Sequence, residues 1–106
     1  MNDIKRAIRI IHADGREETR EGSTMLPSDE AKKIVGGWTE TVWVLHQRKR
    51  TCMLVNETGA IQDPPLPINK KATEIYHNAS RARGQDWKGA PYIHGTVILY
   101  EGMDIR

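Results

Sequence analysis

The sequence predicts an α+β domain in which helices cover a mostly antiparallel sheet. Four short stretches rich in valine, isoleucine and aromatic residues show the alternating or continuous apolar patterns typical of strands, and a fifth, polar stretch follows a turn signal. Two other segments carry helix start and stop signals and an apolar stripe of helical spacing. The resulting order, ββαββαβ, predicts one sheet with both helices packed on one face.

The first hairpin and the first helix are predicted from the amino-terminal third. Residues 4–12 place Ile8 and Ile10 on one face of a strand, "DG" supplies a turn, and residues 17–21 form a polar edge strand. In "LPSDEAKKIVGG", Ser28 is expected to cap a helix that begins with acidic residues. Gly36 and Gly37 are expected to end this helix.

The second hairpin follows directly. Residues 38–47, "WTETVWVLHQ", carry apolar groups on both faces, which predicts an interior strand. The basic turn "QRKR" leads into the apolar strand "TCMLVN". The lone Cys52 in this strand excludes an internal disulfide and is expected to be buried and inert.

The last third contains a proline-rich loop, a helix and a strand. "AIQDPPLPI" is expected to run as an extended loop, because proline donates no hydrogen bond to a sheet. Asn69 is expected to cap the second helix, which packs one face through Ala72, Ile75 and Ala79 and ends at Gly84. "YIHGTVILY" is the most continuously apolar run and is expected to be a central strand.

Composition limits the function classes. A chain of 106 residues predicts a single domain over 1–106, and 38% apolar with 28% charged residues is an ordinary globular balance. The net charge of +2 excludes an acidic DNA mimic and is too small to imply DNA binding by itself. Without a signal-peptide core or a transmembrane stretch, the protein is expected to be cytoplasmic, with no membrane partner.

No residue pattern indicates catalysis or a metal. The four histidines repeat no ligand spacing, and the nucleophile-elbow, Walker and dinucleotide fingerprints are absent. We therefore expect no enzyme activity, no catalytic residues, no metal and no cofactor.

The start of the second helix is the leading candidate site. Lys70 and Lys71 occupy the first turn, where acids are usual, and so deepen the positive potential that helix amino termini offer to phosphate or carboxylate. Asn69 belongs to the same helix start, and Trp87 and Tyr92 could supply aromatic faces for a base or ring. The alternative interpretation is a solvated basic helix.

Three further charged residues are candidates. Glu40 lies on an apolar strand face, where it either pairs with a cross-strand arginine or contacts a ligand. Arg48 and Arg50 form a basic hairpin turn, which is either solvated or converges on a neighbour's helix start in a symmetric oligomer.

The chain resembles a small domain family of unknown function found mostly in bacteriophages and bacterial mobile elements. The resemblance rests on "AKKIVGGWTETV", "MLVNETGAI", "LPINKKATEIY" and "IHGTVILYEG", and covers roughly residues 5–101. Its polar positions correspond to Glu40, Asn56 and Asn69. The resemblance implies a phage accessory protein without established catalysis, and it makes Asn56 a further candidate ligand contact.

These observations favour a non-catalytic, homo-oligomeric binder of an anionic, nucleotide-like ligand. Such a protein would sequester a nucleotide immune signal of the bacterial host and so counter host defence. One alternative is a protein–protein inhibitor of a host defence protein, anchored by an exposed tryptophan. Another is weak nucleic-acid binding through the basic turn and helix.

Overall fold

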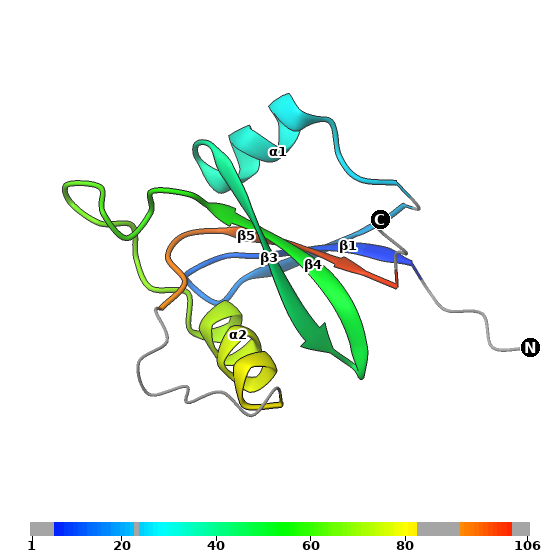
Figure 1. The fold of residues 1–106 in the computed structure, drawn as a ribbon. Coiled ribbons are helices and arrows are strands. Elements are labelled where there is room, and N and C mark those ends of the chain that lie inside the picture. The colour runs from blue at the N-terminus through cyan, green and yellow to red at the C-terminus, as the bar shows by residue number, and fades with distance from the viewer. Residues whose placement is uncertain (1–5, 23, 83–91, 103–106) are drawn as a thin grey trace, which may run out of the picture.

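The protein is an α+β fold built on a five-stranded antiparallel sheet. The computed structural model describes residues 6–22, 24–82 and 92–102 (Figure 1). In this part of the chain the strands are ordered β2-β1-β5-β4-β3. The elements in chain order are β1 (Ala7–Ile11), β2 (Glu17–Glu21), α1 (Ser28–Val35), β3 (Thr39–His46), β4 (Lys49–Asn56), α2 (Lys70–Ala82) and β5 (Val97–Glu101).

Two hairpins and one long-range strand make the sheet. β1 pairs with β2, and β3 pairs with β4, each antiparallel as the turn signals predict. β5 lies between the hairpins and pairs with β1 on one side and β4 on the other. All five residues of β5 are buried, which confirms the prediction of a central strand at the end of the chain.

The expectation that both helices cover one face is wrong, because α1 and α2 lie on opposite faces of the sheet (Figure 1). Val97 and Leu99 of β5 pack in the core under α2, whereas Ile98 and Tyr100 pack in the core under α1. Successive side chains of a strand point to opposite faces. The continuous apolar run "VILY" of β5 therefore has side chains to bury on both faces of the sheet, and one helix covers each face.

The prediction that residues 38–47 form an interior strand is also wrong. β3 is an edge strand, paired with β4 alone in the described part of the chain. Its apolar residues serve both cores, since Val44 packs under α2 and Trp43 packs against the α1 side. Apolar side chains on both faces of β3 are thus covered although β3 is an edge strand, because α1 and α2 each extend over it.

The ends of α1 agree with the sequence at one terminus only. Pro27, not Ser28, is the residue before the helix, and no side chain caps it. Ser28 is the first helical residue instead. Gly36 ends the helix in the left-handed conformation, with φ of 85°, and its amide and that of Gly37 both donate to the Lys32 carbonyl.

Two titratable side chains, Cys52 and Tyr100, are buried in the core in their neutral forms. Cys52 is 2% exposed, and burial raises the pKa of its thiol, which agrees with an inert cysteine. Tyr100 is fully buried, and its hydroxyl accepts a hydrogen bond from the Leu26 amide at 3.2 Å. Burial also raises the pKa of this phenol, so the hydroxyl stays neutral and ties the segment before α1 to the sheet.

Candidate functional site

Two adjoining hollows lie along the first half of α2. The first, which we call the Lys70 hollow, has a volume of about 300 Å³. Its lining residues are Ile68, Lys70, Thr73, Glu74, His77, Asn78 and Tyr92. The helical members are spaced i, i+3, i+4, i+7 and i+8, so they form one polar face of α2. This stripe was visible in the sequence, where only its first residue was singled out.

The second hollow, which we call the Glu40 hollow, has a volume of about 180 Å³. It is lined by Glu40, Val42, Val55, Asn56, Glu57, Ala60, Tyr76, Tyr92, Ile93 and His94. Tyr92 borders both hollows and is 59% exposed. The fold therefore brings four of the predicted residues to the lining of the two hollows: Glu40, Asn56, Lys70 and Tyr92.

The two lysines of the first turn point in different directions. Successive helical residues are rotated by about 100°. Lys70 consequently lines the hollow, whereas Lys71 is exposed and lies outside both hollows. The first turn of α2 contains no acidic residue, and neither lysine forms an ion pair within the described residues. Only Lys70 is placed to add to the positive potential of the helix start inside the hollow.

Asn69 caps α2 as predicted, but its side chain is fully used by the protein. Its amide oxygen accepts from the Ala72 amide at 3.0 Å, and its nitrogen donates to the carbonyls of Ile11 and Gly95, each at 2.9 Å. The residue is 1% exposed. Asn69 thus fastens the helix start to the sheet and leaves no donor or acceptor facing a ligand.

Asn56 borders the Glu40 hollow but directs its amide elsewhere. Its nitrogen donates to the Val35 carbonyl at 3.1 Å, and its oxygen accepts from the Thr58 amide at 2.9 Å. At 6% exposure, the side chain joins the end of α1 to the loop after β4. Gly37 packs against it, since a Cβ there would lie 3.1 Å from Asn56 Nδ2. Asn56 therefore has a structural role at the glycine-containing end of α1.

Glu40 is exposed on the α2 face of β3, opposite Val55. Its partner across the sheet is apolar, and within the described residues it forms no ion pair. Of the two interpretations left open by the sequence, the cross-strand ion pair is absent from this part of the chain. Its carboxylate remains available at the mouth of the Glu40 hollow.

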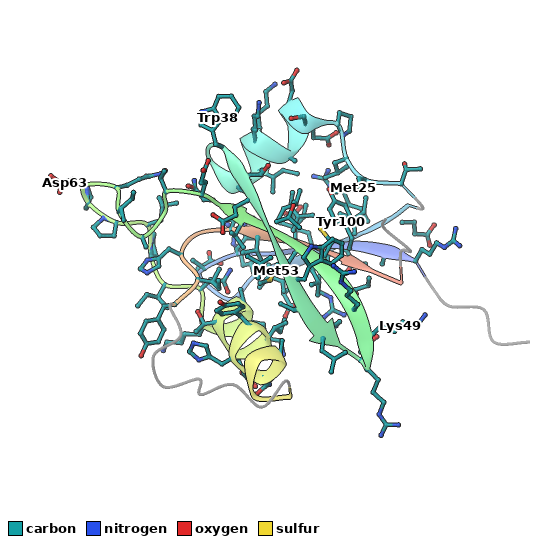
Figure 2. The ribbon with its side chains drawn as sticks, in the orientation of Figure 1. Met25, Trp38, Lys49, Met53, Asp63 and Tyr100 are labelled. Carbon is teal, nitrogen blue, oxygen red and sulfur yellow. The ribbon has the colours of Figure 1, made fainter. Side chains whose placement is uncertain are left out.

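The remaining predicted residues lie away from the hollows. The turn between β3 and β4 places Lys49 at the opposite end of the hairpin from Trp38 (Figure 2). Arg48 is exposed at this turn with φ of 64°, and the Arg50 guanidinium lies 4.0 Å from the centre of the Trp43 ring. Neither arginine lines the hollows. Trp87 lies outside the described residues.

A third and larger cleft, of about 450 Å³, lies between the end of β1 and the end of α1. At its wall the His12 ring links two elements. His12 Nε2 lies 2.7 Å from a Glu18 carboxylate oxygen, and the Thr96 hydroxyl lies 3.3 Å from His12 Nδ1. An ionised carboxylate can only accept a hydrogen bond, so Nε2 is the donor to Glu18 and Nδ1 of the neutral ring accepts from the Thr96 hydroxyl. Sequence spacing did not predict this cluster, because only the pairing of the strands brings together the turn after β1, β2 and the segment before β5.

The His12–Glu18 contact predicts a pH-dependent contribution to stability. The hydrogen bond from His12 holds the pKa of Glu18 below its ordinary value, so ionised Glu18 stabilises the folded state. This stabilisation is fully present above the ordinary glutamate pKa of about 4.3 and is lost as the pH falls through the lowered pKa. Urea-unfolding midpoints of Glu18→Gln and of the unchanged protein should therefore differ near neutral pH and converge in acid.

Glu21→Gln is the matched control, because Glu21 lies on the same strand and forms no ion pair within the described residues. Its midpoint should follow that of the unchanged protein at every pH. A Glu18→Gln difference that does not change with pH would contradict the electrostatic explanation.

No protein-family model, curated protein or solved structure matches the chain. The resemblance to a bacteriophage family therefore stays a prediction.

Within residues 6–22, 24–82 and 92–102, no group of three histidine, cysteine or acidic residues is placed to hold a metal ion. The helices of these segments lack the length and apolar character needed to cross a membrane.

Proposed function

We propose that the protein is a non-catalytic binding protein for an anionic, nucleotide-like ligand held across the two hollows. The observation that carries this proposal is that Lys70 and Tyr92 line the same hollow at a helix start without acidic residues. A lysine at a helix amino terminus favours a phosphate, and an exposed tyrosine ring offers a face on which a base can stack.

The charges of the two hollows suggest an orientation for the ligand. The Lys70 hollow combines one lysine with Glu74, whereas the Glu40 hollow contains two carboxylates, from Glu40 and Glu57. Phosphate is repelled by carboxylates, but sugar hydroxyls and exocyclic amines donate hydrogen bonds to them. The phosphate therefore belongs beside Lys70, the base on Tyr92, and the sugar or amine beside Glu40.

Calorimetric titration with cyclic nucleotides, cyclic dinucleotides and ADP-ribose tests the proposal. A charge-assisted hydrogen bond is worth about 1.5–3 kcal/mol, so Lys70→Glu should weaken binding by about 10-fold or more. Lys71→Glu makes the same charge change one residue further on, outside the hollow, and should weaken binding only slightly. Tyr92→Ala should cost a similar factor to Lys70→Glu if a base stacks on the ring.

Two results would contradict this function. The first is the absence of binding heat with every ligand of the series. The second is an equal loss of affinity in Lys70→Glu and Lys71→Glu, which would indicate a general effect of net charge and not a contact in the hollow.

The resemblance to a bacteriophage family extends the proposal to a biological role. A cytoplasmic binder of this kind could remove a nucleotide signal that activates a bacterial defence system. Expression of the protein should then raise phage yield in a host that carries such a system, and Lys70→Glu should abolish the effect while Lys71→Glu retains it.

A host protein is the second candidate partner. Trp38 is 67% exposed beside α1, and the Lys32 ammonium lies 3.9 Å from the centre of its ring (Figure 2). Exposed tryptophans often anchor protein interfaces. Capture of one defined defence protein that is lost in Trp38→Ala and unaffected by Lys70→Glu would favour this alternative.

A further inference from the structure

The two edges of the sheet differ in chemistry. β2 forms one edge, and its five residues, "EETRE", are all exposed and mostly charged, which is how proteins protect an edge from pairing. β3 forms the other edge with eight residues, "TETVWVLH", of which only Glu40 is acidic. Within the described residues, β3 has a hydrogen-bonding partner on one side only. A long edge strand with a single acidic residue is a ready partner for another strand.

The hydrogen-bond pattern shows which groups of β3 face outward. The Glu57 amide donates to the Trp38 carbonyl at 2.8 Å, which makes Trp38 a bonded residue toward the β4 side. Bonded residues alternate along an antiparallel strand. Glu40, Val42, Val44 and His46 therefore bond inward to β4. The outward amides and carbonyls belong to the residues between them, Thr39, Thr41, Trp43 and Leu45.

We propose that this edge pairs antiparallel with β3 of a second copy, around a two-fold axis at Val42. In this register Thr39 faces Leu45 and Thr41 faces Trp43, so every outward residue meets another outward residue. Moving the axis to Thr41 or Trp43 leaves a terminal outward residue without a partner in the opposite strand. The Val42 register therefore satisfies the whole edge.

The side chains fit the same register. Val42 lies opposite Val42 of the second copy, and Glu40 lies opposite Val44, so no like charges face each other. The two sheets join into one ten-stranded antiparallel sheet. Glu40 and Val42 also line the Glu40 hollow, so the second copy would border it. The pairing itself does not depend on any ligand.

Sedimentation equilibrium of the full chain tests the dimer. The expected mass at micromolar concentrations is twice 12.1 kDa. Thr41→Pro removes an outward amide that β4 does not use, and proline is tolerated on edge strands, so this variant should sediment as a folded monomer.

Thr19→Pro is the matched control at the opposite edge. The His12 amide donates to the Arg16 carbonyl, and alternation along β2 then places the Thr19 amide outward as well. This variant should remain a dimer. A monomeric unchanged protein, or a folded Thr41→Pro dimer, would overturn the proposal.

Amide hydrogen exchange of the unchanged protein provides a test without a variant. The amides of Thr39, Thr41, Trp43 and Leu45 should be protected at high protein concentration and lose protection on dilution. The amides of Val42 and Val44 should stay protected throughout. Outward amides that exchange rapidly at every concentration would overturn the proposal even if Thr41→Pro does not fold.

The register is tested by crosslinking. Residues on a two-fold axis in a non-hydrogen-bonded antiparallel pair have Cα atoms about 4.5 Å apart, within the range of a disulfide. Val42→Cys should form a covalent dimer on mild oxidation, whereas Val44→Cys, which faces Glu40, should not. Efficient crosslinking at Val44 and none at Val42 would overturn the proposed axis.

Discussion

Asn69→Ala is expected to lower the free energy of unfolding by about 3–5 kcal/mol, the largest loss from any single polar side chain described above. The substitution removes the cap of α2 and leaves the carbonyls of Ile11 and Gly95 without their donor. Because the site is 1% exposed, water cannot readily replace the amide. Urea unfolding followed by circular dichroism measures the loss directly.

Asn69→Asp separates the two roles of this residue. Aspartate retains the oxygen that caps the helix, but it replaces the donating nitrogen by an oxygen that faces two carbonyls. We expect Asn69→Asp to be at least as unstable as Asn69→Ala near neutral pH. An aspartate variant as stable as the unchanged protein would show that the two carbonyl contacts contribute nothing.

Gly95→Ala is expected to cost about 1–3 kcal/mol, mainly from backbone strain and in smaller part from a steric contact. Gly95 has φ of 84°, a conformation that other residues rarely adopt. A Cβ at this position would also lie 2.8 Å from Leu66 Cδ1, well inside van der Waals contact. Leu66 is only half-buried and its Cδ1 is the end of the side chain, so a rotation of Leu66 relieves part of this contact.

Gly15→Ala isolates the backbone term of that cost. Gly15 has a similar φ of 96°, but nothing lies within 4 Å of the Cβ that an alanine would add. This control should cost about 1 kcal/mol. Adding Leu66→Ala to Gly95→Ala should then relieve the clash and leave the strain. Equal losses in Gly95→Ala and Gly15→Ala would contradict the steric explanation.

The fold class could be predicted from the sequence because local signals were strong. The Asp14–Gly15 turn, the glycines after Val35 and the cap at Asn69 each determine backbone geometry by themselves. Strand order was harder to assign. A strand with apolar groups on both faces can lie inside a sheet or at an edge under overhanging helices, and β3 shows the second case.

The candidate site was only partly predictable for a related reason. Lys70 stood out because its charge opposes the usual preference of a first helical turn. The rotation between Lys70 and Lys71, which determines which of them lines the hollow, depends on how α2 packs on the sheet. The hydrogen bonds of Asn56 are also long-range, since Val35 and Thr58 approach it only in the folded chain.

The place of β5 has a consequence for how the protein folds. β5 is the last strand in the chain order, yet it lies between the two hairpins and is the contact through which β1 and β4 belong to one sheet. The hairpins can form early, because their contacts are local. They cannot be joined until β5 docks between them, so the apolar edges of β1 and β4 stay exposed during the earlier stages of folding. Docking of β5 is therefore expected to be the step that turns two separate hairpins into one sheet.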